Sequence, residues 1–149
     1  MNEQRTEPHY SEWVLPNWTS FLPVLAVYPT LWLTFLPINE LLGVWLGVGL
    51  SVATVGLMFA KSARIEVDPE YLSVSNAKIE RSFVSNVQAV PTDEAFAERG
   101  RNLDSRAWIH FQGSVKTLVK VTISDPDDET PYWLFSSRKP EELKKALGF

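Results

Sequence analysis

The chain has 149 residues, with 14 lysines and arginines against 18 aspartates and glutamates, and a formal net charge of −4. This length suits one small domain, with or without an appendage. The slightly acidic balance, without a block of basic residues, excludes an extended nucleic-acid-binding surface. The absence of cysteine excludes a disulfide framework and a thiolate metal site.

Ionisable residues are distributed very unevenly along the chain. Glu40 is the single one between residues 21 and 60, and all lysines and arginines but one follow that segment. We therefore expect three parts: a cytoplasmic N-terminal tail over residues 1–17, a transmembrane helical hairpin over residues 18–60, and a polar folded domain over residues 61–149.

The first apolar segment, residues 18–36, is uncharged but contains Pro23 and Pro29. Proline is tolerated in membrane helices where neighbouring groups satisfy the freed carbonyls, so we expect a kinked first span. The aromatic residues before and at its start, Tyr10, Trp13 and Trp18, are typical of an interfacial belt.

The second apolar segment, residues 41–60, reads "LLGVWLGVGLSVATVGLMFA". Its length is what a helix needs to cross about 30 Å of hydrocarbon. It lacks the polar face that a buried helix of a soluble protein usually shows. Lys61 and Arg64 follow it, where their side chains would reach the headgroup layer.

The distribution of basic residues predicts the orientation of this hairpin. The connecting residues 37–40 contain no lysine or arginine, whereas four basic residues follow the second span: Lys61, Arg64, Lys78 and Arg81. By the positive-inside rule, both termini face the cytoplasm, and the protein is a multi-pass protein of the inner membrane.

Small residues in the second span predict close helix packing. Gly43 and Gly47 form a GxxxG pattern, and Ser51 extends the same face. Such residues let helix backbones approach closely in a membrane. We expect this face to pack against the first span of the same chain, and a homodimer contact is the alternative.

After residue 60 the hydrophobic period changes to that of strands. Alternation of apolar and polar residues predicts strands in "RIEVD", "YLSVS", "KIERSF", "VSNVQAV", "AWIHF" and "LVKVTIS". "PYWLF" is apolar throughout, which predicts a strand covered on both faces. Residues 140–147 form a helix, with Pro140 at its start and Gly148 after its end. Residues 91–105 are either a loop or a short surface helix.

These elements define an α+β membrane protein. Five to seven antiparallel strands closed by one C-terminal helix are the pattern of a small β-barrel or sandwich similar to the pleckstrin-homology (PH) fold, by analogy of fold alone. The N-terminal two-helix hairpin would anchor this domain in the bilayer.

The polar domain shows no known catalytic motif, and the sequence predicts no catalytic residue, cofactor or metal ligand set. His9 falls in the expected tail, and His110 lies in a predicted strand without an orienting partner. The best metal candidate is the acidic cluster Asp125, Asp127, Asp128 and Glu129. Its spacing is not that of a calcium loop, and Asp-Pro and Thr-Pro are ordinary turn dipeptides, so we expect a turn.

A second group of residues combines cations with aromatic rings: Arg106, Trp108, Tyr132, Trp133 and Arg138. Arginine and large aromatic residues are common anchors of binding interfaces. The alternative is that Trp108 and Trp133 belong to the core and that the arginines pair with nearby acids.

The stretch "DPDDETPYWLFSSRKPEELKKAL" resembles the ending of a family of small actinobacterial membrane proteins known as domain of unknown function 3093. The matching residues are Asp125, Pro126, Asp128, Pro131, Tyr132, Trp133, Leu134, Ser136, Arg138 and Pro140. The segments "RAW" and "RIEV" and the order of two spans before a β-rich domain also resemble this family. The resemblance implies an inner-membrane protein of actinobacteria and no particular activity.

The sequence leaves three hypotheses for function. The first is a non-enzymatic, membrane-anchored interaction module that binds a protein or lipid headgroups at the cytoplasmic face. The second is a membrane-surface enzyme or enzyme subunit that uses Asp125, Asp128 and Arg138. The third is a small oligomeric transporter.

Overall fold

The computed structural model describes residues 9–149. The chain forms two compact units. Unit 1 combines the described residues up to Val14 with Ala63–Phe149, and unit 2 comprises Leu15–Ser62. Unit 1 is therefore built from two segments of the chain, with unit 2 inserted between them.

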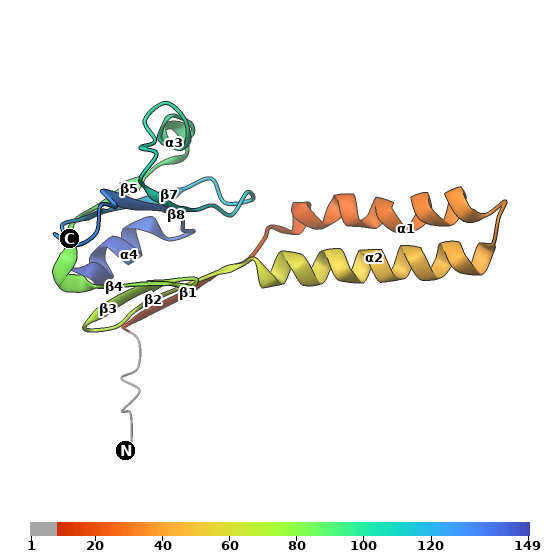
Figure 1. Cartoon of the computed structure of the whole chain (residues 1–149), viewed down its shortest axis with the longest axis horizontal. Helices are drawn as coiled ribbons and strands as arrows, with labels where there is room; N and C mark the ends of the chain where they lie inside the picture. The colour runs from red at the N-terminus through yellow and green to blue at the C-terminus, as the bar shows by residue number, and fades with distance from the viewer. Residues whose placement is uncertain (1–8) are drawn as a thin grey trace, which may run out of the picture. The chain divides into compact units, whose positions relative to one another are not determined.

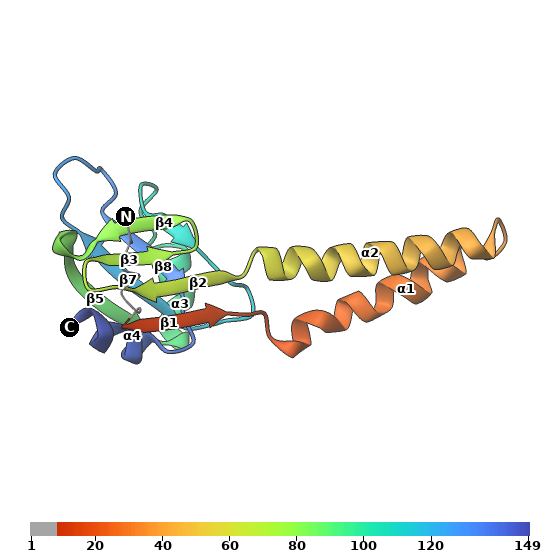
Figure 2. The same ribbon diagram turned by 90° about the horizontal axis from the view of Figure 1, so that it is seen from below.

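The first sheet of unit 1 contains four strands in the order β1-β2-β3-β4, each antiparallel to the next (Figures 1 and 2). They are β1 (Tyr10–Val14), β2 (Ala63–Val67), β3 (Tyr71–Val74) and β4 (Ala77–Glu80). Strand β1 precedes unit 2 in the sequence and β2 follows it. Their pairing runs from Tyr10 opposite Val67 to Val14 opposite Ala63.

The sequence predicts a separate N-terminal tail over residues 1–17, and the structure corrects this prediction for residues 10–14. Residues 10–14 are a strand of the folded domain, and the His9 amide donates to the Val67 carbonyl at 2.8 Å. Tyr10 points into the domain, where it packs against the core, and so is not a residue of an interfacial belt. Residues 1–8 lie outside the described residues.

The second sheet contains four strands in the order β5-β7-β8-β6. They are β5 (Val84–Val90), β6 (Trp108–His110), β7 (Leu118–Ile123) and β8 (Tyr132–Ser136), and a 3-10 turn at Arg81–Phe83 precedes β5. The pairs β5–β7 and β7–β8 are antiparallel, whereas β6 and β8 are parallel. The sheet is thus mixed, which corrects the expectation of antiparallel strands alone.

The two sheets share one core that also contains helix α4 (Pro140–Leu147) (Figure 1). Val14, Ile65 and Leu72 of the first sheet contribute to it, and Phe135 of the second sheet is fully buried there. Alternation along each strand places these side chains on the inner face. The eight strands in the described residues form two sheets and not a closed barrel, which corrects the barrel expectation.

Helix α4 follows the sequence signals that predicted it. Its first turn carries Glu141 and Glu142, and Gly148 ends it with a φ of 88°, a left-handed conformation that glycine adopts without strain. Leu143 and Leu147 are buried in the shared core. Four residues along a helix separate side chains of one face, so this spacing packs α4 against the sheets.

The outer face of the second sheet is also covered. A second cluster includes Leu118, Tyr132 and Leu134 of the sheet and Ala95 of helix α3 (Thr92–Arg99). All five residues of β8 are buried. This confirms the prediction that both faces of the "PYWLF" strand are covered. Residues 91–105, for which the sequence allows a loop or a short helix, contain the short helix α3.

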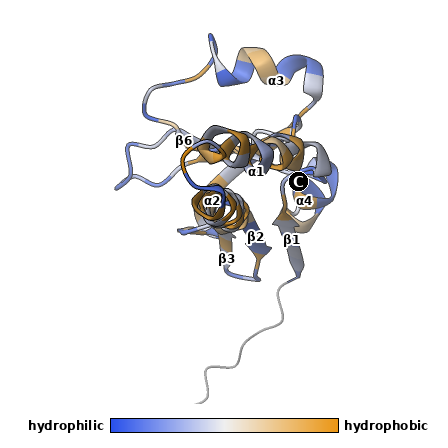
Figure 3. Ribbon diagram, turned by 90° about the vertical axis from the view of Figure 1, so that its right-hand side faces the viewer, coloured by the Kyte–Doolittle hydropathy of each residue, from blue (hydrophilic) through white to orange (hydrophobic). Residues whose placement is uncertain are grey.

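Unit 2 is a hairpin of α1 (Leu22–Phe35), preceded by a 3-10 turn at Trp18–Phe21, and α2 (Glu40–Ala60). Trp18–Phe35 and Glu40–Ala60 are long and apolar enough to span a membrane. Figure 3 shows that most of their residues are hydrophobic. Within unit 2, Asn39 caps α2 by accepting a bond from the Leu42 amide at 3.2 Å.

The two helices meet where α2 has no side chains. A Cβ atom added at Gly43 would lie 3.1 Å from the Trp32 carbonyl oxygen, and one added at Gly47 would lie 3.0 Å from the Tyr28 ring. The GxxxG face is thus in contact with α1 of the same chain. Ser51 continues this face, and its hydroxyl is buried.

Candidate functional site

A buried carboxylate joins the two segments of unit 1. Glu12 of β1 is 8% exposed. Its Oε2 accepts a bond from the Ser137 hydroxyl at 2.6 Å and from the Tyr10 hydroxyl at 2.8 Å, while its Oε1 accepts from the Arg138 amide at 2.6 Å. We call Tyr10, Glu12, Ser137 and Arg138 the Glu12 junction. It connects the strand before unit 2 to the loop before α4.

The Glu12 junction continues into neighbouring loops. The Thr117 hydroxyl donates to the Ser137 carbonyl at 2.6 Å, and the Gln112 amide donates to the Ser136 hydroxyl at 3.0 Å. The Ser137 hydroxyl also accepts from the Lys139 amide at 3.1 Å. Both serines are buried, so these bonds satisfy polar groups that would otherwise be costly to bury. These contacts hold the loop before β7 against the end of β8 and the residues that follow it.

The junction makes stability depend on pH through Tyr10. Burial, and then the hydrogen bond to the Glu12 carboxylate, raise the pKa of the Tyr10 hydroxyl. The unfolded chain therefore releases this proton first, so the Tyr10 contribution is complete below about pH 10 and is lost as the pH rises above it. We expect the wild-type protein to lose more stability than Tyr10→Phe between about pH 8 and pH 11. Urea unfolding in detergent at both pH values measures this, and equal losses would contradict it.

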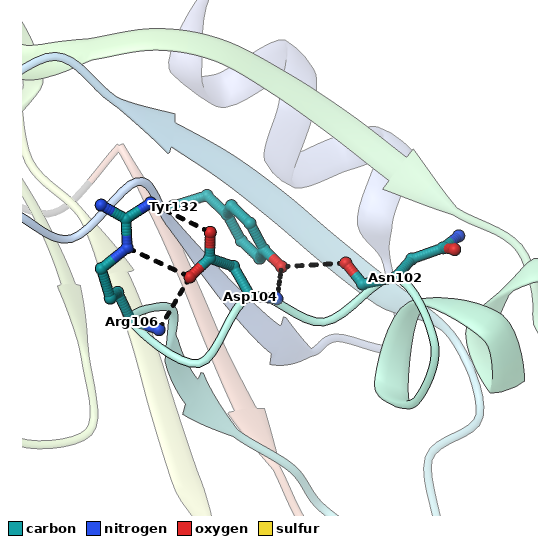
Figure 4. A network of polar contacts seen from close by, with 4 residues as sticks. All are labelled: Asn102, Asp104, Arg106 and Tyr132. Atoms are coloured by element: carbon teal, nitrogen blue, oxygen red, sulfur yellow. Dashed lines mark hydrogen bonds and ion pairs between the residues drawn. The ribbon is translucent and has the colours of Figure 1, made fainter.

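A second polar network lies at the opposite end of β8 (Figure 4). The Tyr132 hydroxyl accepts a bond from the Asp104 amide at 2.8 Å and donates to the Asn102 carbonyl at 3.3 Å. Arg106 and Asp104 form an ion pair at 3.2 Å. The Arg106 guanidinium lowers the pKa of the Asp104 carboxyl. These contacts hold the loop after α3 against the outer face of the second sheet.

Lys120 connects this network to α3. Its Nζ atom lies 2.8 Å from the Glu98 carboxylate and 4.3 Å from the centre of the Tyr132 ring. The hydrogen bond from Lys120 lowers the pKa of Glu98. A cation over an aromatic face is attracted by the ring quadrupole. Tyr132 thus serves as a packing surface for Lys120 and as a bonding partner for the loop.

The cation and aromatic group expected from the sequence is divided between the two faces of the second sheet. The Trp108 and Trp133 rings lie 4.8 Å apart and pack in the shared core. Tyr132 faces the outer cluster, and Arg106 pairs with Asp104. For Trp108 and Trp133, the structure agrees with the alternative that these tryptophans belong to the core. For Arg106, it agrees with the alternative that the arginine pairs with a nearby acid.

Asp125, Asp128 and Arg138 do not form one polar site. Asp125 and Asp128 precede β8 and Arg138 follows it. A strand rises about 3.3 Å per residue, so the five residues of β8 separate its ends by roughly 17 Å. The side-chain arrangement that an enzyme using these three residues would need is therefore not formed.

The acidic loop has the contacts of a turn. Asp125 accepts a bond from the Asp127 amide and Asp128 accepts one from the Thr130 amide, both at 2.9 Å. The bond from Thr130 lowers the pKa of Asp128. Pro131 connects this turn to β8, and its carbonyl accepts from the Ile123 amide. Across residues 9–149, no group of three or more His, Asp or Glu side chains is placed to hold a metal ion.

Sequence reasoning missed the residue that organises the junction. Glu12 falls within the N-terminal tail that the sequence predicts over residues 1–17. One available signal was the alternation of Tyr10, Glu12 and Val14, which share a face of β1. Nothing local indicates that the acid on this face accepts bonds from residues 125 positions away.

The architecture defines a class: a β-sandwich domain, built from two chain segments, that carries an inserted hairpin of two apolar helices. Within this class, the chain belongs to the family described as "Protein of unknown function (DUF3093)", whose model matches residues 9–147. A search of curated proteins and a search of solved structures found no match.

Proposed function

We propose that this chain is a multi-pass inner-membrane protein that presents a PH-like β-sandwich at the cytoplasmic face as a non-enzymatic interaction module. One observation carries the membrane part of the proposal. None of the Trp18–Phe35 segment is buried, and 11% of the Glu40–Ala60 window is. Helices of this length with unburied apolar side chains are stable where lipid surrounds them.

The construction of unit 1 supports a single side for both ends of the hairpin. Residues 15–17 and the 3-10 turn connect the end of β1 to the start of α1. Residues 61–62 connect the end of α2 to the start of β2. Because β1 and β2 are hydrogen-bonded neighbours, they fold on the same side of a bilayer. The absence of lysine and arginine from residues 37–40 supports a cytoplasmic position for this side.

The shape of unit 1 supports an interaction role. Two four-stranded sheets with a C-terminal helix in their shared core support the PH-like comparison. The family motif residues act mainly in folding: Tyr132, Trp133 and Arg138 join strands, core and loops. The C-terminal motif also supports an actinobacterial origin. The binding surface is therefore expected on exposed side chains that these folding contacts do not occupy.

Cysteine labelling tests the orientation directly, because the chain contains no cysteine. Ile38, between the helices, is 74% exposed, and Ser105 lies on an exposed loop of unit 1. With a membrane-impermeant maleimide, we expect Ile38→Cys to react in intact cells and Ser105→Cys to react after the membrane is opened. The reverse pattern would invert the orientation, and release of the chain by alkaline carbonate would contradict membrane insertion.

A further inference from the structure

We infer that one end of the β-sandwich binds anionic phospholipid headgroups through Arg64, Lys116 and Arg138, together with Trp13. We call it the linker end, because β1 and β2 reach the linkers to the helices there. The inference rests on the proposed membrane anchoring and names the chemistry of the surface that the domain contacts.

Strand pairing and hydrogen bonds bring three separate segments to the linker end. Val14 and Ala63 are the last pair of the β1–β2 ladder at this end. Two residues before Val14, Glu12 accepts bonds from Ser137 and Arg138, and Ser137 in turn accepts from Thr117. The β6–β7 loop and the loop before α4 therefore lie beside the end of β1.

The side chains at the linker end suit a membrane surface. Trp13 is 59% exposed and lies directly across from Arg64, whose side chain is 67% exposed. Lys116 and Arg138 are exposed as well. Tryptophan is enriched at the headgroup level, and lysine and arginine are attracted to anionic lipids there.

The ion pairs of Arg64 and Lys139 do not remove these two cations from lipid. Arg64 pairs with Glu66, and Lys139 pairs with Glu142, both at 2.8 Å with exposed or half-exposed side chains. Exposed pairs of this kind contribute little, so the phosphates of lipid headgroups can compete for the cations.

The opposite end of the sandwich carries acids. It contains the turn Asp68–Glu70, Glu80, and the loop Asp125–Glu129. These segments meet around the 3-10 turn, where Arg81 donates to the Asp68 carbonyl and the Ser124 amide donates to Phe83. An anionic membrane repels these acids and attracts Arg64, Lys116 and Arg138, so these side chains favour contact through the linker end.

Two matched labels test the orientation in the full-length chain. Gly113→Cys places a thiol in the β6–β7 loop, where an added Cβ meets no atom within 4 Å, and Ser105→Cys places one at the acidic end. Each carries the same fluorophore in nanodiscs of phosphatidylcholine alone or with one quarter phosphatidylglycerol, containing a headgroup nitroxide quencher. We expect stronger quenching at residue 113 than at 105, with a difference that grows with phosphatidylglycerol.

Charge removal separates headgroup binding from simple proximity. Lys116→Gln with Arg138→Gln is expected to reduce the phosphatidylglycerol dependence, because each cation near an anionic surface changes the equilibrium constant for docking by roughly fivefold. The control, Arg101→Gln with Lys145→Gln, removes the same charge elsewhere and is expected to preserve it. Equal quenching at both labels, or equal effects of the two pairs, would overturn the inference while leaving the membrane anchoring intact. A chain that does not co-purify with the nanodiscs would overturn both.

Discussion

Replacing Glu12 with alanine is expected to lower the free energy of unfolding of unit 1 by roughly 3 kcal/mol. The substitution removes the acceptor for the Ser137 hydroxyl, the Arg138 amide and the Tyr10 hydroxyl. Ser137 is fully buried, so its hydroxyl cannot turn to water without opening the junction. Bonds to a carboxylate are stronger than neutral ones, and an unsatisfied buried donor carries its full desolvation cost.

Thermal unfolding in detergent measures this effect, with tryptophan fluorescence as the signal. For a domain of this size, the expected loss corresponds to a fall in the midpoint of roughly 12 to 24 °C. Ser11→Ala is the matched control, because Ser11 is its neighbour on the exposed face of β1. Glu12→Gln keeps an oxygen acceptor and is expected to fall between the two. A Glu12→Ala protein that unfolds with the wild type would show that the junction does not hold β1 in place.

The Glu12 junction also explains why strand β1 was not predicted. The other strands are detectable because alternation is local, as in Val119, Val121 and Ile123 of β7. In β1 the inward position between Tyr10 and Val14 is an acid, so the pattern is broken at its centre. Its partner strand begins about fifty residues later in the sequence, beyond unit 2, and no local signal reports such pairing.

The architecture of the second sheet shows a related limit. The alternation of "AWIHF" predicts that β6 is a strand, but it does not reveal which neighbour β6 takes or in which direction. Trp108 lies opposite Trp133, and the contact of their rings accompanies the parallel pairing. A three-residue edge strand is too short for its sequence to specify a direction, so the tertiary packing decides it.

The candidate site could be predicted in composition but not in arrangement. Asp128 and Arg138 are ten residues apart in the sequence and look like neighbours in a motif. A buried strand between them places them at opposite ends of the sandwich. By contrast, Gly43 and Gly47 could be placed on one helix face from spacing alone, because helical periodicity is local.

The second large effect is expected in unit 2, where Gly47→Leu should separate the two helices. A Cβ at this position lies 3.0 Å from the Tyr28 ring and 3.1 Å from the Tyr28 carbonyl oxygen. The ring can rotate, but the carbonyl belongs to the α1 backbone, so the helices must move apart. Overpacking of a tight contact costs about 1–3 kcal/mol. Equilibrium unfolding of the chain with increasing fractions of SDS in mixed micelles measures it.

Gly49→Leu is the matched control for this experiment, because an added Cβ there meets no atom within 4 Å. Both substitutions raise helix propensity by a similar amount, so their difference isolates the contact with α1. We expect Gly49→Leu to unfold at or above the SDS fraction of the wild type, and Gly47→Leu clearly below it. If Gly49→Leu were instead the destabilised variant, the close contact of α2 would be with another chain. The packing of Gly47 against Tyr28 would then not be what holds the hairpin together.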